Sequence, residues 1–99
     1  MEQKNESIDG TAITVAPSNV TAVAIDAGNV LITWSSVLSA TGYHVFRGTT
    51  SDGSYQLVQE TTSLALVDTG LAANTTYYYR ITAYDADGDG TMSQPAIVT

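Results

Sequence analysis

The 99-residue sequence contains no cysteine and a single histidine, His44. Without cysteine, the chain has no disulfide, no thiolate nucleophile and no cysteine-ligated metal site. One imidazole, with no acidic residue on its own predicted strand, builds neither a zinc site nor a catalytic triad. The sequence also lacks a Gly-x-Ser-x-Gly nucleophile motif and a glycine-rich phosphate loop. These absences predict a protein that is not an enzyme and that uses no cofactor.

Basic residues are also scarce, because 3 lysines and arginines stand against 10 acidic residues, for a net charge of −7. Binding to nucleic acid requires a basic surface that replaces phosphate counterions, so that function is excluded. An anionic membrane surface is disfavoured for the same reason. No hydrophobic run approaches the roughly 18 residues of a membrane-spanning helix. The first ten residues lack the apolar stretch of a signal peptide. Either the protein is not secreted or the sequence is a piece of a longer protein, and its single-domain length favours the second.

Hydrophobic residues make up 43% of the chain, which is typical of one globular domain with a modest core. Residues 1–16 begin with a polar stretch and are expected to form a flexible tail or linker, with the domain at residues 17–99. Within this first part, "TAITVAP" is similar in order to the closing "PAIVT". The similarity has two explanations that the sequence leaves open: the last strand of a preceding copy, or chance between two Thr/Val-rich pieces.

From Pro17 onward, the hydrophobic pattern has a period of two, as in β-strands. The predicted strands cover residues 20–25, 30–34, 42–48, 55–61, 64–68, 76–85 and 92–99. Gly, Asp, Asn and Ser separate these runs, and none shows sustained helical spacing. The alternation predicts a set of inward-facing side chains: Val30, Ile32, Trp34, Tyr43, Val45, Tyr77, Tyr79, Ile81 and Ala83. Seven short strands with turns between them predict an antiparallel β-sandwich.

Four segments, "VLITW", "ATGYHVFRG", "DTGLAANTTYYYRITAYDADG" and "SQPAIVT", occur in an order and spacing that resembles a fibronectin type III domain over residues 17–99. An antibody-type domain would carry its tryptophan on the third strand, whereas here it lies on the second. The resemblance implies an all-β, seven-stranded, immunoglobulin-like sandwich. Its strands A, B and E would form one sheet, and strands C, C′, F and G the other.

The resemblance also implies structural roles for four residues. Trp34 would be the core tryptophan of the second strand, packed near Tyr43. Leu71, followed six residues later by Tyr77, is similar to the tyrosine corner of the family. In that corner the tyrosine ring caps the core, and its hydroxyl bonds to backbone upstream in the chain.

The segment "DADGDG" places Asp85, Asp87 and Asp89 at alternate positions, as in the first half of an EF-hand calcium loop. The twelfth position, which requires a bidentate glutamate, is Ala96, and the flanking segments are predicted strands rather than helices. In the family this segment is the turn between strands F and G, where residues that tolerate positive φ are needed. We therefore predict a turn without a metal, with a weak surface calcium site as the alternative.

A further set of residues is predicted to point outward from strands C and F, which are neighbours in the family. The set is His44, Phe46, Tyr78, Arg80, Thr82 and Tyr84. Aromatic strips with polar neighbours bind sugars or proteins, so this face is a candidate binding surface. The alternative is that these side chains serve cross-strand pairing alone, with His44 at an exposed strand position.

The sequences of the matching segments are similar to those of bacterial and archaeal members of the family. By resemblance, we expect a non-catalytic spacer or accessory module of a secreted or cell-surface multidomain protein, such as a glycoside hydrolase. The alternatives are a polysaccharide- or protein-binding module, and a repeat unit of an adhesin or phage-surface stalk. The expected partners are neighbouring domains of the same polypeptide, and the module is expected to be monomeric and extracellular.

Overall fold

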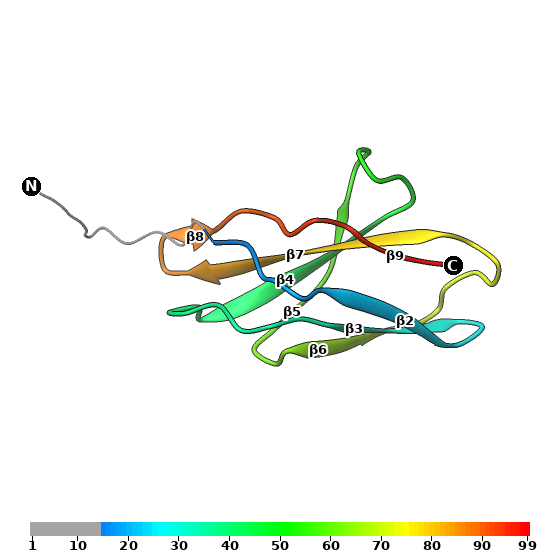
Figure 1. Cartoon of the computed structure of the whole chain (residues 1–99), viewed down its shortest axis with the longest axis horizontal. Helices are drawn as coiled ribbons and strands as arrows, with labels where there is room; N and C mark the ends of the chain where they lie inside the picture. The colour runs from blue at the N-terminus through cyan, green and yellow to red at the C-terminus, as the bar shows by residue number, and fades with distance from the viewer. Residues whose placement is uncertain (1–14) are drawn as a thin grey trace, which may run out of the picture.

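The computed structural model describes residues 15–99, which form two antiparallel β-sheets packed face to face (Figure 1). The smaller sheet has the order β2-β3-β6, formed by Thr21–Asp26, Asn29–Thr33 and Ala65–Asp68. The larger sheet has the order β5-β4-β7-β8, with β9 also paired to β7. Its strands are Gln56–Thr61, Gly42–Gly48, Tyr77–Asp85, Gly88–Asp89 and Ala96–Val98. The predicted all-β sandwich is confirmed, with β2, β3 and β6 as strands A, B and E.

The predicted alternation is confirmed on the three strands that supply most of the core. Ile32, Val45, Tyr79 and Ile81 have no exposed surface. Full burial of an aliphatic or aromatic side chain contributes about 1.5–3 kcal/mol, so these positions stabilise the sandwich most. Trp34 and Tyr43, also buried, meet edge to face with ring centroids 5.7 Å apart.

A buried polar cluster, which the sequence reading missed, crosses the core between the two sheets. Asp68 on β6 accepts hydrogen bonds from Arg47 Nη1 on β4 and from the Tyr79 hydroxyl on β7, both at 2.7 Å. Burial is the main cause that raises the pKa of Tyr79, and the bond to Asp68 adds to it. The pairing with Asp68 raises the pKa of Arg47. Arg47 and Tyr79 both lie at inward-facing positions in the alternation of their strands. This alternation is the feature of the sequence from which the cluster could have been predicted.

The described chain begins at the β8 end of the sandwich, and Thr99 lies toward the opposite end (Figure 1). The predicted tail at residues 1–16, and the segment similar to the C-terminal strand, lie mostly outside the described residues. Among residues 15–99, no helix has the length and apolar character needed to cross a membrane.

Candidate functional site

The outer face of β4 carries a row of aromatic rings. Gly42, His44, Phe46 and Gly48 alternate onto this face, and rings from elsewhere occupy the space above the two glycines. A Cβ at Gly42 would lie 2.6 Å from the Tyr84 hydroxyl, and one at Gly48 would lie 3.2 Å from Tyr55 Cδ2. The glycines thus admit the two tyrosines, in a manner similar to the aromatic rescue of glycine in sheets. We define the aromatic row by its four rings, in order along β4: Tyr84, His44, Phe46 and Tyr55.

Ring contacts join three members of the aromatic row. His44 stacks on Tyr84 with centroids 4.5 Å apart and an interplanar angle of 19°. His44 also meets Phe46 edge to face, at 6.3 Å and 65°. Such pairs stabilise a folded protein by about 0.5–1.5 kcal/mol beyond the area they bury. The row is therefore held in place by contacts among its own side chains.

Two carboxylates flank His44. Its Nδ1 lies 2.9 Å and 3.0 Å from the two oxygens of Asp89, which also accepts a 2.6 Å hydrogen bond from Thr82 Oγ1. Its Nε2 lies 3.5 Å from Glu60 Oε1, and the other oxygen of Glu60 accepts a hydrogen bond from the Tyr84 hydroxyl. An ionised carboxylate can only accept, so the hydrogen of the Asp89 contact resides on Nδ1.

This arrangement shifts the pKa of two neighbouring groups. Burial by itself would raise the pKa of Asp89, but the hydrogen bonds from Thr82 and His44 lower it below its ordinary value. The hydrogen bond to Glu60 raises the pKa of the Tyr84 hydroxyl. Both shifts follow from one cause: each hydrogen bond favours the protonation state in which it can form.

The expectation that His44 lies at an exposed strand position was wrong. The side chain of His44 is only 21% exposed, because Tyr84 and the two carboxylates cover it. Thr82 lies on the same face but is 2% exposed, since it donates to Asp89. The covering groups come from β5, β7 and β8, so the pattern of β4 alone could not reveal them.

The remaining predicted members lie at the Gly48 end of this face. Arg80 places its guanidinium 5.5 Å from the centroid of the Tyr55 ring and donates through Nε to the Ser93 carbonyl at 2.8 Å. Tyr78 pairs across the sheet with Gly48. The structure thus adds Tyr55, Glu60 and Asp89 to the predicted face. Gly48 leaves space on β4 for a ring, and this glycine is the feature of the sequence that could have indicated the position of Tyr55.

The "DADGDG" segment forms the hairpin between β7 and β8. Ala86 and Asp87 are its two turn residues, Asp85 Oδ1 accepts a 2.8 Å bond from the Asp87 amide, and Gly88 takes φ = +113°. The carboxylate of Asp89 is engaged with β4 and β7. Within residues 15–99, no group of three or more His, Cys, Asp or Glu residues is placed to hold a metal ion. The geometry of this segment accordingly provides no support for the calcium alternative.

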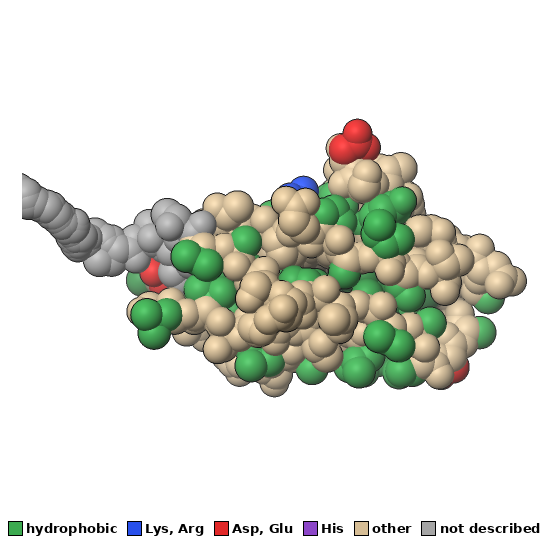
Figure 2. Space-filling model, in the orientation of Figure 1, with side chains coloured by type: hydrophobic (Ala, Val, Ile, Leu, Met, Phe, Trp, Pro, Cys, Tyr) green, Lys and Arg blue, Asp and Glu red, His purple; other side chains and the backbone are tan. Residues whose placement is uncertain are grey.

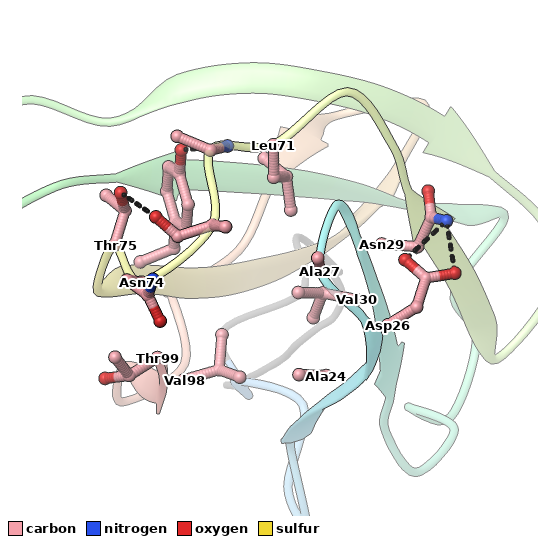
Figure 3. A pocket seen from close by; sticks show the side chains of 13 residues that line it. Ala24, Asp26, Ala27, Asn29, Val30, Leu71, Asn74, Thr75, Val98 and Thr99 are labelled. Atoms are coloured by element: carbon pink, nitrogen blue, oxygen red, sulfur yellow. Dashed lines mark hydrogen bonds between the residues drawn. The ribbon is translucent and has the colours of Figure 1, made fainter.

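A small hollow of about 180 Å³ lies at the end of the sandwich near Val98 (Figure 3). It is bounded by the β2–β3 turn, by residues 71–75 and by the end of β9. Leu71 and Tyr77 help to line it, and the Tyr77 hydroxyl accepts a 3.0 Å bond from the Ala72 amide. This bond to backbone upstream is the contact that the resemblance assigned to the tyrosine corner. It fixes the loop that forms one wall of the hollow.

Comparison with known proteins identifies the family. The model of the fibronectin type III domain matches residues 15–99. The chain belongs to the fibronectin type III family. A solved Fn3-like protein from Clostridium thermocellum superposes with a TM-score of 0.80 at 30% identity, over 87% of this chain and 92% of that chain.

Curated relatives of this fibronectin type III domain are much longer proteins. An α-amylase from Niallia circulans is 31% identical over 84% of the chain, and exoglucanase B from Cellulomonas fimi is 34% identical over 90%. A poly(3-hydroxybutyrate) depolymerase from Delftia acidovorans is 34% identical over 82%. The chain spans 6%, 8% and 16% of the α-amylase, the exoglucanase and the depolymerase, respectively. It therefore corresponds to one module of each relative.

Proposed function

We propose that this fibronectin type III domain is a non-catalytic spacer and accessory module of a secreted or cell-surface enzyme that degrades a polymer. The observation that carries the proposal is the set of relatives, in which the matching segment is a small part of an α-amylase, an exoglucanase and a polyester depolymerase. Three enzymes of different specificity share one module, so the module itself is expected to supply none of their activities. We propose an extracellular location on the same ground.

The mechanism is mechanical. The described chain enters at one end of the sandwich and leaves toward the other, so the domain separates whatever precedes it from whatever follows it (Figure 1). A packed core and the buried Asp68 cluster tie the two sheets together, so the spacer is stiff. A Gly/Ser linker of similar reach behaves as a random coil and fixes no orientation. A stiff spacer thereby sets both the distance and the orientation between its neighbours.

The proposal is tested by exchange in a relative. In the Cellulomonas fimi exoglucanase, the matching segment is replaced either by this chain or by a Gly/Ser linker of equal reach. Hydrolysis of insoluble cellulose is then compared with hydrolysis of a soluble oligosaccharide. We expect the chain, and not the linker, to preserve activity on insoluble cellulose, while soluble activity is the same in both. Equal performance of chain and linker on insoluble cellulose would contradict the spacer function.

A second function, binding of a polysaccharide, is favoured by the aromatic row. The row combines rings with the exposed carboxylate of Glu60, which can accept hydrogen bonds from the hydroxyl groups of a sugar. A neutral glycan also avoids the repulsion that a net charge of −7 imposes on anionic ligands. His44 and Tyr84 shield one face of each other, so a sugar would contact the remaining faces and edges of the row.

An amide NMR titration of the chain with cellulose, xylan and chitin oligosaccharides tests this second function. Shifts that gather at the aromatic row are the expected result, and Phe46→Ala, within the row, and Tyr78→Ala, beside its Gly48 end, should weaken them. Val67→Ala, on the outer face of the other sheet, is the matched control and should change nothing. A spectrum unmoved by all three glycans would rule out binding of these glycans and leave the spacer.

A further inference from the structure

We propose that the outer face of the β2-β3-β6 sheet adsorbs to the surface of an uncharged aliphatic polyester, because the described residues of this face form a contiguous aliphatic set without a charged side chain. The inference rests on the proposed function as a module of a polymer-degrading enzyme, and it selects the class of polymer from the chemistry of the face. We define the aliphatic face by its four large side chains: Val23 and Ile25 on β2, Leu31 on β3, and Val67 on β6.

The register of the smaller sheet aligns three of these side chains across the strands. Val23 lies directly opposite Leu31, and Leu31 lies directly opposite Val67. On β3, Val30 and Ile32 are buried in the core, so the alternation of the strand directs Leu31 away from the core. Side chains that are directly opposite each other on one face are in contact. The row is therefore one continuous surface that crosses all three strands.

The aliphatic face departs from the usual pattern of an antiparallel sheet, whose solvated face carries polar side chains. Val23 and Ile25 are each 54% exposed, and Val67 is 45% exposed. The hydroxyls of Thr21 and Thr33 lie at the border of the face, 2.6 Å apart, and hydrogen-bond to each other. One of these two hydroxyl hydrogens remains free for an external acceptor. Contiguous exposed apolar surface of this kind marks a site of interaction.

The charged residues of the described chain lie away from the aliphatic face. Apart from Asp26 and Asp68, they lie on the larger sheet or in its loops. Asp68 is buried between the sheets, and Asp26 is engaged in the β2–β3 turn by bonds from the Gly28 amide and from Asn29 Nδ2. Figure 2 shows hydrophobic side chains along the lower side of the molecule, where Figure 1 places β2 and β6. The face is therefore suited to an uncharged partner.

The side chains of the face also distinguish between classes of uncharged partner. A glycan is bound by aromatic rings with polar groups beside them, and the aromatic row lies on the other sheet. Binding energy between proteins is concentrated in Trp, Tyr and Arg, and none of these residues in the described chain lies on the aliphatic face. An aliphatic polyester offers alkyl groups to the valines and ester carbonyls to the free threonine hydroxyl.

The position and the stiffness of the aliphatic face suit adsorption to a solid. The described chain begins at one end of the sandwich and finishes toward the other, so the face lies at the side and neighbouring domains leave it accessible (Figure 1). Valine and isoleucine have few rotamers, so they lose little conformational entropy on contact. The three strands are only 6, 5 and 4 residues long, so the twist of the sheet bends the face little.

Adsorption of the 99-residue chain to a poly(3-hydroxybutyrate) film, followed with a quartz-crystal microbalance, tests the proposal. We expect adsorption that sodium sulfate strengthens, because sulfate favours the burial of apolar surface. Val23→Thr combined with Val67→Thr retains the shape of both side chains. Full burial of one valine corresponds to about tenfold in affinity, and each valine is already about half covered, so the double variant should adsorb about tenfold more weakly. Leu57→Thr, at a 56% exposed position on β5 of the larger sheet, is the matched control and should adsorb like the unmodified chain.

Three other results would count against the aliphatic face as a polyester-binding surface, once thermal melts verify that the variants are folded. Absence of adsorption, or equal adsorption of the chain and the double valine variant, would overturn the proposal. Adsorption to a cellulose film that depends on the same two valines would show that the class of polymer is wrong. Self-association of the free chain in sedimentation, abolished in the double valine variant, would assign the face to a second copy instead.

The spacer function is tested separately, because the exchange in the exoglucanase measures hydrolysis of cellulose and the film measures adsorption to a polyester. A chain that preserves activity in the exchange and does not adsorb to the film would refute this inference and leave the spacer function intact. A chain that adsorbs through the two valines and performs no better than the linker would do the reverse.

Discussion

Removal of the Asp68 carboxylate is the perturbation that most directly probes how the two sheets are held together. Asp68 is 5% exposed and accepts two 2.7 Å hydrogen bonds, from Arg47 and from Tyr79. Asp68→Ala leaves the Tyr79 hydroxyl, which has no exposed surface, without its acceptor. It also leaves the guanidinium of Arg47 without its counter-charge.

The expected cost follows from these environments. Loss of one partner of a buried ion pair destabilises a protein by about 3–5 kcal/mol. The side chain of Arg47 is 32% exposed and regains some hydration, so we expect Asp68→Ala to lower the free energy of unfolding by about 3 kcal/mol. Tyr79→Phe removes one hydrogen bond to a charged acceptor but retains the ion pair, so about 1.5 kcal/mol is expected. Native domains have a free energy of unfolding of about 5–15 kcal/mol, so the stability of both variants should remain measurable.

Urea unfolding followed by tryptophan fluorescence measures both changes, since Trp34 lies in the core. The dependence of the free energy on urea should be unchanged, because the same surface is exposed on unfolding. Arg47→Met, alone and combined with Asp68→Ala, completes a double-mutant cycle. The double variant should cost less than the sum of the single variants, since it leaves no unpaired charge. Additive costs, or a cost below about 1 kcal/mol for Asp68→Ala, would refute the account of Asp68 as the link between the sheets.

Three other predictions concern the aromatic row and its hairpin. The pKa of Asp89 in the folded protein is lower than the ordinary aspartate pKa of 3.8. The ionised carboxylate therefore stabilises the fold fully above pH 3.8, and this stabilisation is lost as the pH falls through the pKa of the folded protein. Urea unfolding should show that Asp89→Asn has a lower free energy of unfolding than the unmodified chain at neutral pH, and that this difference shrinks in acid. A difference that does not change with pH would contradict the coupling between the ionisation of Asp89 and stability. Gly42→Ala should displace the Tyr84 ring and cost about 1 kcal/mol, seen as changed ring shifts in NMR; unchanged shifts would contradict the coverage of this glycine. Gly88→Ala should cost about 1–2 kcal/mol because of the φ of +113°, whereas Gly28→Ala, with nothing nearer than 3.5 Å to its Cβ, should be close to neutral in the same unfolding assay.

The strands could be predicted because one physical period governs them. Side chains alternate across a strand, so a buried face must show apolar residues at every second position. Val30 and Ile32 on β3, and Tyr79 and Ile81 on β7, follow this rule, and all four are buried. The sheet order was also predicted, but through the order and spacing of four segments that resemble the family, and not through the period.

The contacts of Asp89, the fifth residue of the turn segment, could not be predicted from the strand period. Asp89 was interpreted as part of the loop between two strands, yet it lies in β8 and its carboxylate contacts His44, which is 45 residues away in the chain. Nothing in the local sequence distinguishes it from Asp85 or Asp87. The register of β7 with β8 and of β7 with β4 brings it to that position.

The sequence by itself determined the class of fold, the inward and outward faces of β3, β4 and β7, and the scarcity of groups that catalysis needs. Tertiary structure alone decided the Asp68 cluster, the carboxylates around His44, the tyrosines over Gly42 and Gly48, and the hollow near Val98. The reason is geometric. Periodicity depends on neighbours along one strand, whereas each of these sites is assembled from segments that lie far apart in the chain, and only the register and packing of the two sheets specify which side chains meet.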